Sequence, residues 1–389
     1  MNASLPESRP RVAIASHAYA VPSETFIRAH VHRLAPGRTV FLVGDGEGTE
    51  GLGLPVLAGV PAFALPVRPP RGLGERIRRA GHGFFLDARE RRVARFLRAH
   101  RPGVLLAEYG PTGCHYRRVC RRLRLPLVVH FHGFDASRLL RQDFYRRAYR
   151  PLFREAAAVV VPSHFLAERL RAAGCPPAKL RVHPCGVDLA GRDPVPGEPG
   201  RVLAVGRLVE KKGPDRTLRA FARVRERCPW ARLRMVGEGP LRPACEAEIE
   251  RLRLHGSVDL LGARSERQVR EEFARASLFV QHSQEADDGD CEGLPVGILE
   301  AMAAGLPVVT TRHSGIPEAI VPGECGWLVE EGDESGMAEA MRRLLTDPAE
   351  AARLGTKARQ RVEARHTMEQ SLAGLRGILE GAALGDLSG

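Results

Sequence analysis

Short apolar runs, each of strand length, alternate with longer amphipathic stretches along most of this chain. The runs fall at 11–16, 39–43, 104–107, 127–131, 158–161, 180–183, 201–205, 232–236, 258–261, 278–281, 308–310 and 327–329. Helical patterns such as 24–34 and 89–100 lie between them. Strands separated by helices in this way predict βαβ units, in which a parallel sheet carries helices on both faces.

One segment, 191–200, interrupts the alternation with three prolines and three glycines, a composition typical of a linker. The 389 residues are about twice the ~100–200 of one domain. We therefore predict an α/β protein with two doubly wound, Rossmann-like domains, 1–190 and 201–365, facing a cleft. Residues 366–389 are expected to form a C-terminal helix and a frayed tail.

Two features bear on where the protein works. No run approaches the ~18 apolar residues that span a bilayer, and the first ten residues are polar, unlike a signal peptide. The eight cysteines are scattered without a Cys-x-x-Cys pair, which indicates reduced thiols rather than zinc ligands. We expect a soluble, cytoplasmic protein.

The chain has a net charge of +13, and the excess of positive charge is confined to its first half. Residues 1–190 hold 31 Lys and Arg against 14 Asp and Glu, whereas the remainder holds 28 against 32. The arginines cluster at 76–79, 89–98, 117–124 and 138–150, with Phe84, Phe85, Leu86, Phe144 and Tyr145 among them. Such a pattern suits an anionic membrane surface. The alternatives are solvated arginines or a nucleic-acid partner; the acidic second half and the 5% aromatic content argue against nucleic acid.

The most specific motif runs from Glu292 to Thr310. Between 293 and 311 the one ionisable residue is Glu300, on a predicted helix 295–304 that is otherwise apolar. A buried carboxylate costs several kcal/mol unless it is hydrogen-bonded, so Glu300 accepts either from nearby backbone or from ligand hydroxyls. Glu292 lies eight residues earlier, up to about 12 Å along a helix. The helix N-terminus between the two glutamates suits a diphosphate.

A second motif follows the first strand of the second half. Arg207, Lys211 and Lys212 stand in a loop, after Gly206, that leads into a helix. Fixed cations in such a loop suit a diphosphate. Alternatively, Arg207 forms a surface ion pair, and Lys211 is expected to point to water.

A third motif, 128–135, ends a predicted strand with His130, His132 and Asp135. His132, beyond the strand and before a glycine, is expected to face the cleft and to exchange protons, whereas His130 is expected to be a satisfied core residue. Asp135 is a candidate helix N-cap, as are the residues 23–25 before the first helix. Asp288, Asp290 and Glu292 resemble a metal loop without further ligands at calcium-loop spacing, and we predict no metal site.

These residues together resemble the family 4 retaining glycosyltransferases of the GT-B superfamily, over about residues 10–365. The resemblance is carried by 292–310, by Gly315-Ile-Pro-Glu318, Gly326-Trp-Leu-Val329, Gly206-Arg-Leu, Pro162-Ser163 and Gly186-Val-Asp188. The segments 22–26 and 132–135 are similar to a branch that acts in bacterial surface-polysaccharide assembly. Many members of the family have a Gly-Gly loop after the first strand, where this chain has His17-Ala-Tyr-Ala20.

The resemblance implies roles for individual residues. The donor would bind the C-terminal domain, and the acceptor the N-terminal domain. Arg207 and Lys212 would bind the diphosphate and Glu300 the ribose, whereas Glu292 and the backbone of Gly293, Leu294, Pro295 and Val296 would contact the transferred sugar. His132 would lie near the reacting centre. The family is metal-independent, uses no cofactor besides the nucleotide sugar, and commonly returns its last helix to the first domain.

We therefore expect a retaining glycosyltransferase that moves a hexosyl group from a UDP- or GDP-hexose to an acceptor hydroxyl, in polysaccharide or glycolipid assembly. A lipid-linked acceptor would place the protein peripherally at the inner membrane face. The alternatives are a sugar epimerase or phosphorylase on the same fold, or glycosylation of a soluble small-molecule acceptor. The few lysines disfavour a pyridoxal-dependent phosphorylase.

Overall fold

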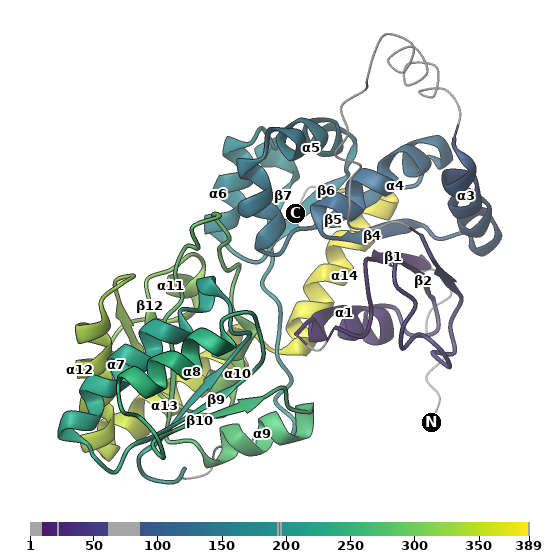
Figure 1. Ribbon diagram of the computed structural model, residues 1–389. Coiled ribbons are helices and arrows are strands. Elements are labelled where there is room, and N and C mark those ends of the chain that lie inside the picture. The colour runs from purple at the N-terminus through teal and green to yellow at the C-terminus, as the bar shows by residue number, and fades with distance from the viewer. Residues whose placement is uncertain (1–9, 22, 61–85, 193, 195–196, 388–389) are drawn as a thin grey trace, which may run out of the picture. The chain divides into compact units, whose positions relative to one another are not determined.

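The computed structural model describes residues 10–21, 23–60, 86–192, 194 and 197–387 (Figure 1). The chain divides into two compact units, Met1–His183 with Leu372–Gly389, and Pro184–Ser371. Each unit is built on one parallel sheet, so the predicted pair of doubly wound α/β domains is confirmed. None of the described helices is both long and apolar enough to cross a membrane.

The first unit holds a seven-stranded parallel sheet in the order β3-β2-β1-β4-β5-β6-β7. Its strands are β1 Val12–Ser16, β2 Thr39–Val43, β3 Val56–Ala58, β4 Val104–Glu108, β5 Leu127–His130, β6 Ala158–Val161 and β7 Leu180–Val182. Strands β1, β2, β4, β5 and β6 are buried along their whole length, as expected where helices cover both faces. Strand β3 was not predicted from the sequence, and its three residues are only half-buried.

The helices of the first unit are α1 Thr25–Ala29, α3 Ala88–His100, α4 Gly110–Leu123, α5 Asp143–Glu155, α6 His164–Ala172 and, from Leu372 onward, α14 Met368–Leu384. The predicted helix 24–34 is not uniform, because α1 continues into a π-helical turn, His30–Leu34. Arg376 of α14 donates to the Leu34 carbonyl at 2.9 Å, which fastens α14 to the end of this turn.

The second unit holds a six-stranded parallel sheet in the order β10-β9-β8-β11-β12-β13. Its strands are β8 Arg201–Val205, β9 Arg232–Val236, β10 Val258–Gly262, β11 Leu278–Gln281, β12 Val308–Thr311 and β13 Trp327–Val329. Its helices are α7 Pro214–Arg227, α8 Arg242–Arg251, α9 Glu266–Arg275, α10 Val296–Ala303, α11 Ile316–Ala319, α12 Glu334–Thr346 and α13 Pro348–Arg365.

Two apolar clusters of the second unit correspond to the two faces of its sheet. Val202 of β8 packs in one cluster with residues of α7, α8 and α12, whereas Leu203, the next residue, packs in the other with residues of α9, α10 and α13. Successive strand residues point to opposite faces, so a strand covered on both sides needs an unbroken apolar run. This requirement explains why strand bounds were readable from the sequence.

In each sheet the strand order reverses at one point, between β1 and β4 in the first unit and between β8 and β11 in the second. The loops leaving such neighbouring strands diverge to opposite faces, and ligands of doubly wound sheets bind in the crevice between them. A ligand site is therefore expected in each unit beside these strands, where the loops after β4 and β8 are among those that line the crevice.

The proline- and glycine-rich run 191–200 is not the boundary between the units, which falls between His183 and Pro184. The described part of this run belongs to the second unit, where Glu198 donates its backbone N–H to the Arg275 carbonyl at 2.8 Å. Gly197 lies so close to the backbone of Ala276 that a Cβ atom would collide with it. At Gly197, the glycine thus allows close packing against the end of α9.

Candidate active site

The loop after β8 begins at the strand-order reversal of the second unit. Arg207 is exposed there, and a turn at Glu210–Lys212 leads into α7. A Cβ atom at Gly206 would meet the side-chain carbons of Lys212 at 3.4 Å, so the glycine leaves room for the lysine stem to pass. Lys212 is thereby directed back over the end of β8.

Lys212 joins the two strongest sequence motifs of the second half. Its Nζ lies 3.1 Å from Oε1 of Glu292 and 3.5 Å from Oε1 of Gln281, the last residue of β11. Burial alone would raise the pKa of Glu292, but Lys212 and Lys211 lower it to about 2. Burial lowers the pKa of Lys212, and Glu292 partly offsets that effect. The structure thus brings a carboxylate and an ammonium group together where a diphosphate was predicted.

Lys211 does not point to water, contrary to the expectation from sequence. It is 6% exposed, and its Nζ lies 3.0 Å from Oδ1 of Asp290. Burial raises the pKa of Asp290, although Lys211 opposes this. An ammonium group therefore engages one carboxylate of the metal-like loop 288–292.

Glu300, on α10, is paired with a residue that the sequence analysis did not single out. Arg192 donates from Nη2 to Oε1 of Glu300 at 2.6 Å and from Nε to the Asp188 carbonyl at 3.1 Å, with its guanidinium over the Phe273 ring. Its buried Nη1 has no hydrogen-bond partner among the described residues. Burial raises the pKa of Glu300, and Arg192 opposes the rise. The alternative that Glu300 is satisfied by nearby backbone gives way to this ion pair.

The segment from Glu292 to Pro295 is not helical, because α10 begins at Val296 with Pro295 as its N-cap. The distance of up to about 12 Å between Glu292 and Glu300 assumed a helix over the whole segment, and this assumption is wrong for Glu292 to Pro295. The Glu292 N–H donates to Nε2 of His313 at 3.1 Å, so His313 carries its ring proton on Nδ1, which lies 2.6 Å from Glu331. Gly293, Leu294 and Pro295 are buried as well. These contacts fix the backbone that leads into α10.

His313 and Gln281, like Arg192, went unnoticed in the sequence. Gln281 could have been found, because it ends a predicted strand beside the point where the strand order reverses. Arg192 and His313 gave no such signal. Arg192 lies in the run 191–200, which was predicted to be a linker, and His313 lies 21 residues from its partner Glu292.

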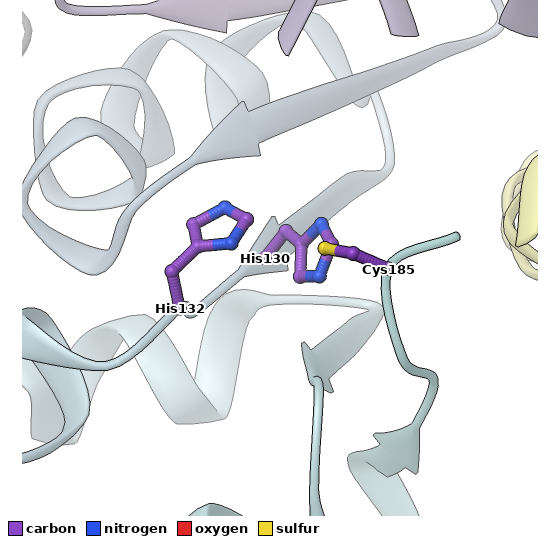
Figure 2. A group of neighbouring side chains, drawn as sticks. All are labelled: His130, His132 and Cys185. Carbon is purple, nitrogen blue, oxygen red and sulfur yellow. The ribbon is translucent and has the colours of Figure 1, made fainter. Parts of the chain in front are cut away.

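In the first unit, the residues at the ends of β4 and β5 gather around one carboxylate. Glu108, wholly buried, lies with Oε1 2.6 Å from Nδ1 of His30 and with Oε2 2.8 Å from Nε2 of His132. Figure 2 shows His130 on β5 and His132 just beyond the strand. The side chain of His132 is 12% exposed, so it connects the buried group with the surface of the unit.

His130 is buried as predicted, but it is not a satisfied core residue. Neither ring nitrogen has a hydrogen-bond partner among the described residues, and Nδ1 lies 3.5 Å from Oε2 of Glu108. Burial holds the pKa of His130 well below its usual value, so the ring is neutral. Within the first unit, His30, Glu108 and His130 each place a possible metal-ligand atom within 4.8 Å of the others.

The predicted helix caps in the first unit have other roles. Asp135 is no helix N-cap; its buried carboxylate accepts from the backbone N–H groups of Gly110, at the start of α4, and of His132. Helix α1 begins at Thr25, and Glu24 at its N-cap position makes no side-chain cap. Glu24 instead accepts from the Tyr109 hydroxyl at 2.8 Å.

The two units thus offer different chemistry. The second unit carries an exposed guanidinium, a buried ammonium–carboxylate pair and a helix N-terminus, which together suit an anionic ligand with hydroxyl groups. The first unit carries a partly exposed imidazole bonded to a buried carboxylate, an arrangement suited to proton exchange or to polarising a hydroxyl.

Comparison with family models divides the chain as the two sheets do. Residues 191–361 match glycosyl transferases group 1, and residues 40–190 match glycosyltransferase family 4. The chain is 35% identical over 272 residues to the putative colanic acid biosynthesis glycosyltransferase WcaL of Escherichia coli, covering 68% of this chain and 66% of the relative. It is 32% identical to the amylovoran biosynthesis glycosyltransferase AmsK of Erwinia amylovora, covering 71% and 70%.

The matched region therefore spans less than two thirds of WcaL, and 59% of the Salmonella typhimurium protein of the same name. Among solved structures, Anabaena Alr3699/HepE in complex with UDP-glucose is similar with a TM-score of 0.78 at 19% identity, over 96% of this chain and 100% of that one. The sucrose-phosphate synthase of Thermosynechococcus elongatus gives a TM-score of 0.77 at 20% identity, over 97% and 100%. At this identity the likeness concerns the fold.

Proposed function

Because this chain belongs to the group 1 and family 4 glycosyl transferases and has the GT-B fold, we propose that it moves a hexosyl group, with retention, from a UDP- or GDP-hexose to an acceptor hydroxyl. The observation that carries the proposal is the Lys212–Glu292 pair, which lies beside Arg207 at the strand-order reversal of the second unit. In a doubly wound sheet this is where a nucleotide binds.

The proposed chemistry centres on the leaving diphosphate. Negative charge builds up on it as the bond to the sugar breaks, and preorganised cations and a helix N-terminus stabilise such charge best. Arg207 and Lys212 supply the cations, and α10 supplies the helix. Glu292 holds the Lys212 ammonium in place and contacts the transferred sugar.

The other residues of the site are proposed to contact the ribose, the transferred sugar and the reacting centre. Glu300 accepts from the ribose hydroxyls, and Gly293, Leu294 and Val296 line the sugar with their backbone. Pro295 has no N–H and contributes only its carbonyl and ring. His132 acts near the reacting centre, where an imidazole can exchange a proton at neutral pH.

Donor screening tests this function directly. We expect release of UDP or GDP from one member of a panel of UDP-, GDP- and ADP-hexoses, and an acceptor product whose anomeric configuration matches that of the donor. An inverted product would overturn retention. Conversion of the sugar without any acceptor would point to an epimerase, and phosphate-dependent cleavage to a phosphorylase.

Transfer should not require a divalent metal. The charge that a metal would neutralise is matched here by Arg207 and Lys212, and Lys211 already engages Asp290 of the metal-like loop. We expect the same turnover after EDTA treatment and dialysis as before. Loss of activity that Mg²⁺ or Mn²⁺ restores would instead assign a metal to Asp288, Asp290 and Glu292.

The acceptor is proposed to be carried by a lipid phosphate at an anionic membrane. Of the four arginine clusters, 76–79 lies outside the described residues, as do Phe84 and Phe85. In the other three, many arginines are exposed on α3, α4 and α5. Tyr145 is buried in the core, however, and Phe144 is half-buried, so these aromatic side chains do not add an apolar anchor. The remaining attraction is electrostatic.

Flotation with liposomes measures this attraction. We expect the protein to float with vesicles of equal parts phosphatidylglycerol and phosphatidylcholine at low salt, since each exposed arginine near such a surface contributes about 1 kcal/mol. Binding should disappear at high salt, where the charges are screened. If pure phosphatidylcholine vesicles bind equally well, or if neither kind binds, a soluble acceptor becomes the better proposal.

A further inference from the structure

We propose that Glu108 is a positioning residue that fixes the ring orientation and the tautomer of His132. The inference rests on the role proposed above for His132. Glu108 is the last residue of β4 and is paired in register with His130 of β5. Glu108 was not predicted as a site residue, because a glutamate at the end of an apolar run does not reveal which side chains surround it.

The contacts of Glu108 join two segments of the first unit. One carboxylate oxygen bonds His30 of the π-helical turn at 2.6 Å, and the other bonds His132 at 2.8 Å. A π-helical turn is rare and often occurs at a functional site. Here it carries His30, whose imidazole forms the second hydrogen bond to the Glu108 carboxylate. Both oxygens are thus engaged, and the side chain is held from two sides.

The charge of Glu108 decides the direction of these bonds. Burial would raise its pKa, but the interaction with His30 and the hydrogen bonds from His132 and His30 hold the pKa well below its ordinary value. A carboxylate only accepts, so both imidazoles donate to it. The neutral His132 ring then carries its proton on Nε2, which makes Nδ1 the basic nitrogen.

Aromatic rings hold His132 from more than one side. The centroid of its ring lies 4.3 Å from that of Phe26, 4.2 Å from that of His130 and 4.7 Å from that of Tyr109. With its nitrogen tied to Glu108 and its faces packed, the ring has one orientation.

Tyr109 reaches His132 through a costly backbone conformation. Its φ of +71° lies in the left-handed region, which a bulky residue adopts only where its surroundings impose it. Here the Tyr109 N–H donates to the His130 carbonyl at 2.8 Å, and its hydroxyl donates to Glu24. Strain is therefore accepted at the residue next to Glu108, as is typical of functional sites.

The tautomer can be measured in the unmodified protein. In a long-range ¹H–¹⁵N spectrum of histidine-labelled protein, with His132 identified from a His132→Asn sample, we expect the pattern of a neutral ring protonated on Nε2. A ring protonated on Nδ1, or a mixture of the two tautomers, would overturn the inference. So would stoichiometric zinc in the purified protein, because His30, Glu108 and His130 would then be metal ligands.

Variants of Glu108 and of His30 distinguish a role in positioning His132 from a role in stability alone. Glu108→Gln should lower kcat about 10- to 100-fold, the loss that follows removal of the carboxylate partner of a metal-bound histidine in other enzymes, while the affinity for UDP or GDP stays unchanged. Glu108→Asp, which keeps the charge, should recover part of the loss. His30→Asn leaves the Glu108–His132 bond in place and should keep the Nε2 tautomer.

The outcomes also distinguish this inference from the proposed function. If Glu108→Gln changes the His132 tautomer without changing turnover, the positioning role stands and the role of His132 in transfer fails. If the tautomer survives Glu108→Ala, which leaves no acceptor in place of the carboxylate, the inference fails whatever the turnover. If that variant does not fold, the spectrum of the unmodified protein still decides.

Discussion

Replacing Lys212 by alanine is expected to lower kcat by about 10²- to 10³-fold, the cost of removing one preorganised group from developing negative charge. The same change should lower the free energy of unfolding by about 3–5 kcal/mol, because it leaves the Glu292 carboxylate buried without its ammonium partner. Turnover by nucleotide release and unfolding by denaturant titration measure the two effects separately.

Three further variants show which effect belongs to which contact. The double variant Lys212→Met with Glu292→Gln removes the charge pair as a unit, so it should regain much of the stability and none of the activity. Lys211→Met breaks a comparable buried pair with Asp290 and should lose stability while kcat is kept. Arg207→Ala, at an exposed position, should lose kcat alone. Wild-type turnover in both Lys212→Ala and Arg207→Ala would place the diphosphate elsewhere.

Glu300→Gln is expected to weaken binding of the nucleotide donor by about 1–3 kcal/mol, which is roughly 5- to 150-fold in Kd. An amide accepts at only one of its two ends, whereas the carboxylate accepts at both. Calorimetry with UDP and GDP measures the loss. Unchanged affinity in a folded variant would exclude Glu300 from the ribose site.

The pairing of Glu300 with Arg192 adds a pH dependence to this prediction. Because the pKa of Glu300 is raised by burial, the carboxylate becomes protonated at a higher pH than an ordinary glutamate, and donor affinity should fall as the pH decreases through that range. Arg192→Met removes the group that opposes the rise, so the fall should move to still higher pH. Glu300→Gln should abolish it. An identical pH profile in all three proteins would contradict the ionic role of the pair.

The sequence was most informative about the sheets. The predicted strands 39–43, 158–161, 201–205, 232–236, 278–281 and 327–329 have the observed bounds. Of these, 39–43, 158–161 and 278–281 are buried along their whole length, and a strand covered on both faces must be largely apolar. The half-buried β3 lacks that requirement and was missed. The π-helical turn was also missed, since its residues keep an ordinary helical pattern and only the hydrogen bonds differ.

Residues of the candidate site were predictable where one short segment carries them. Glu292 and Glu300 stood out as lone charges in apolar surroundings, and Arg207 and Lys212 as cations after a strand. The partners were not predictable, because Arg192 and Glu300 lie 108 residues apart and His30 and Glu108 lie 78 apart. Such pairs depend on how the strands and helices are arranged in space, and a single sequence does not show which distant residues become neighbours.

The π-helical turn His30–Leu34 contains one residue more than an α-helical turn would need. Each helical residue turns the chain by about 100°, so removing one residue there would rotate α1 by that angle relative to everything that follows. Phe26 would then leave the face of the His132 ring. The extra residue of the π-helical turn therefore determines which face α1 turns toward His132. Deleting a single residue within the turn would disturb the site more than most substitutions.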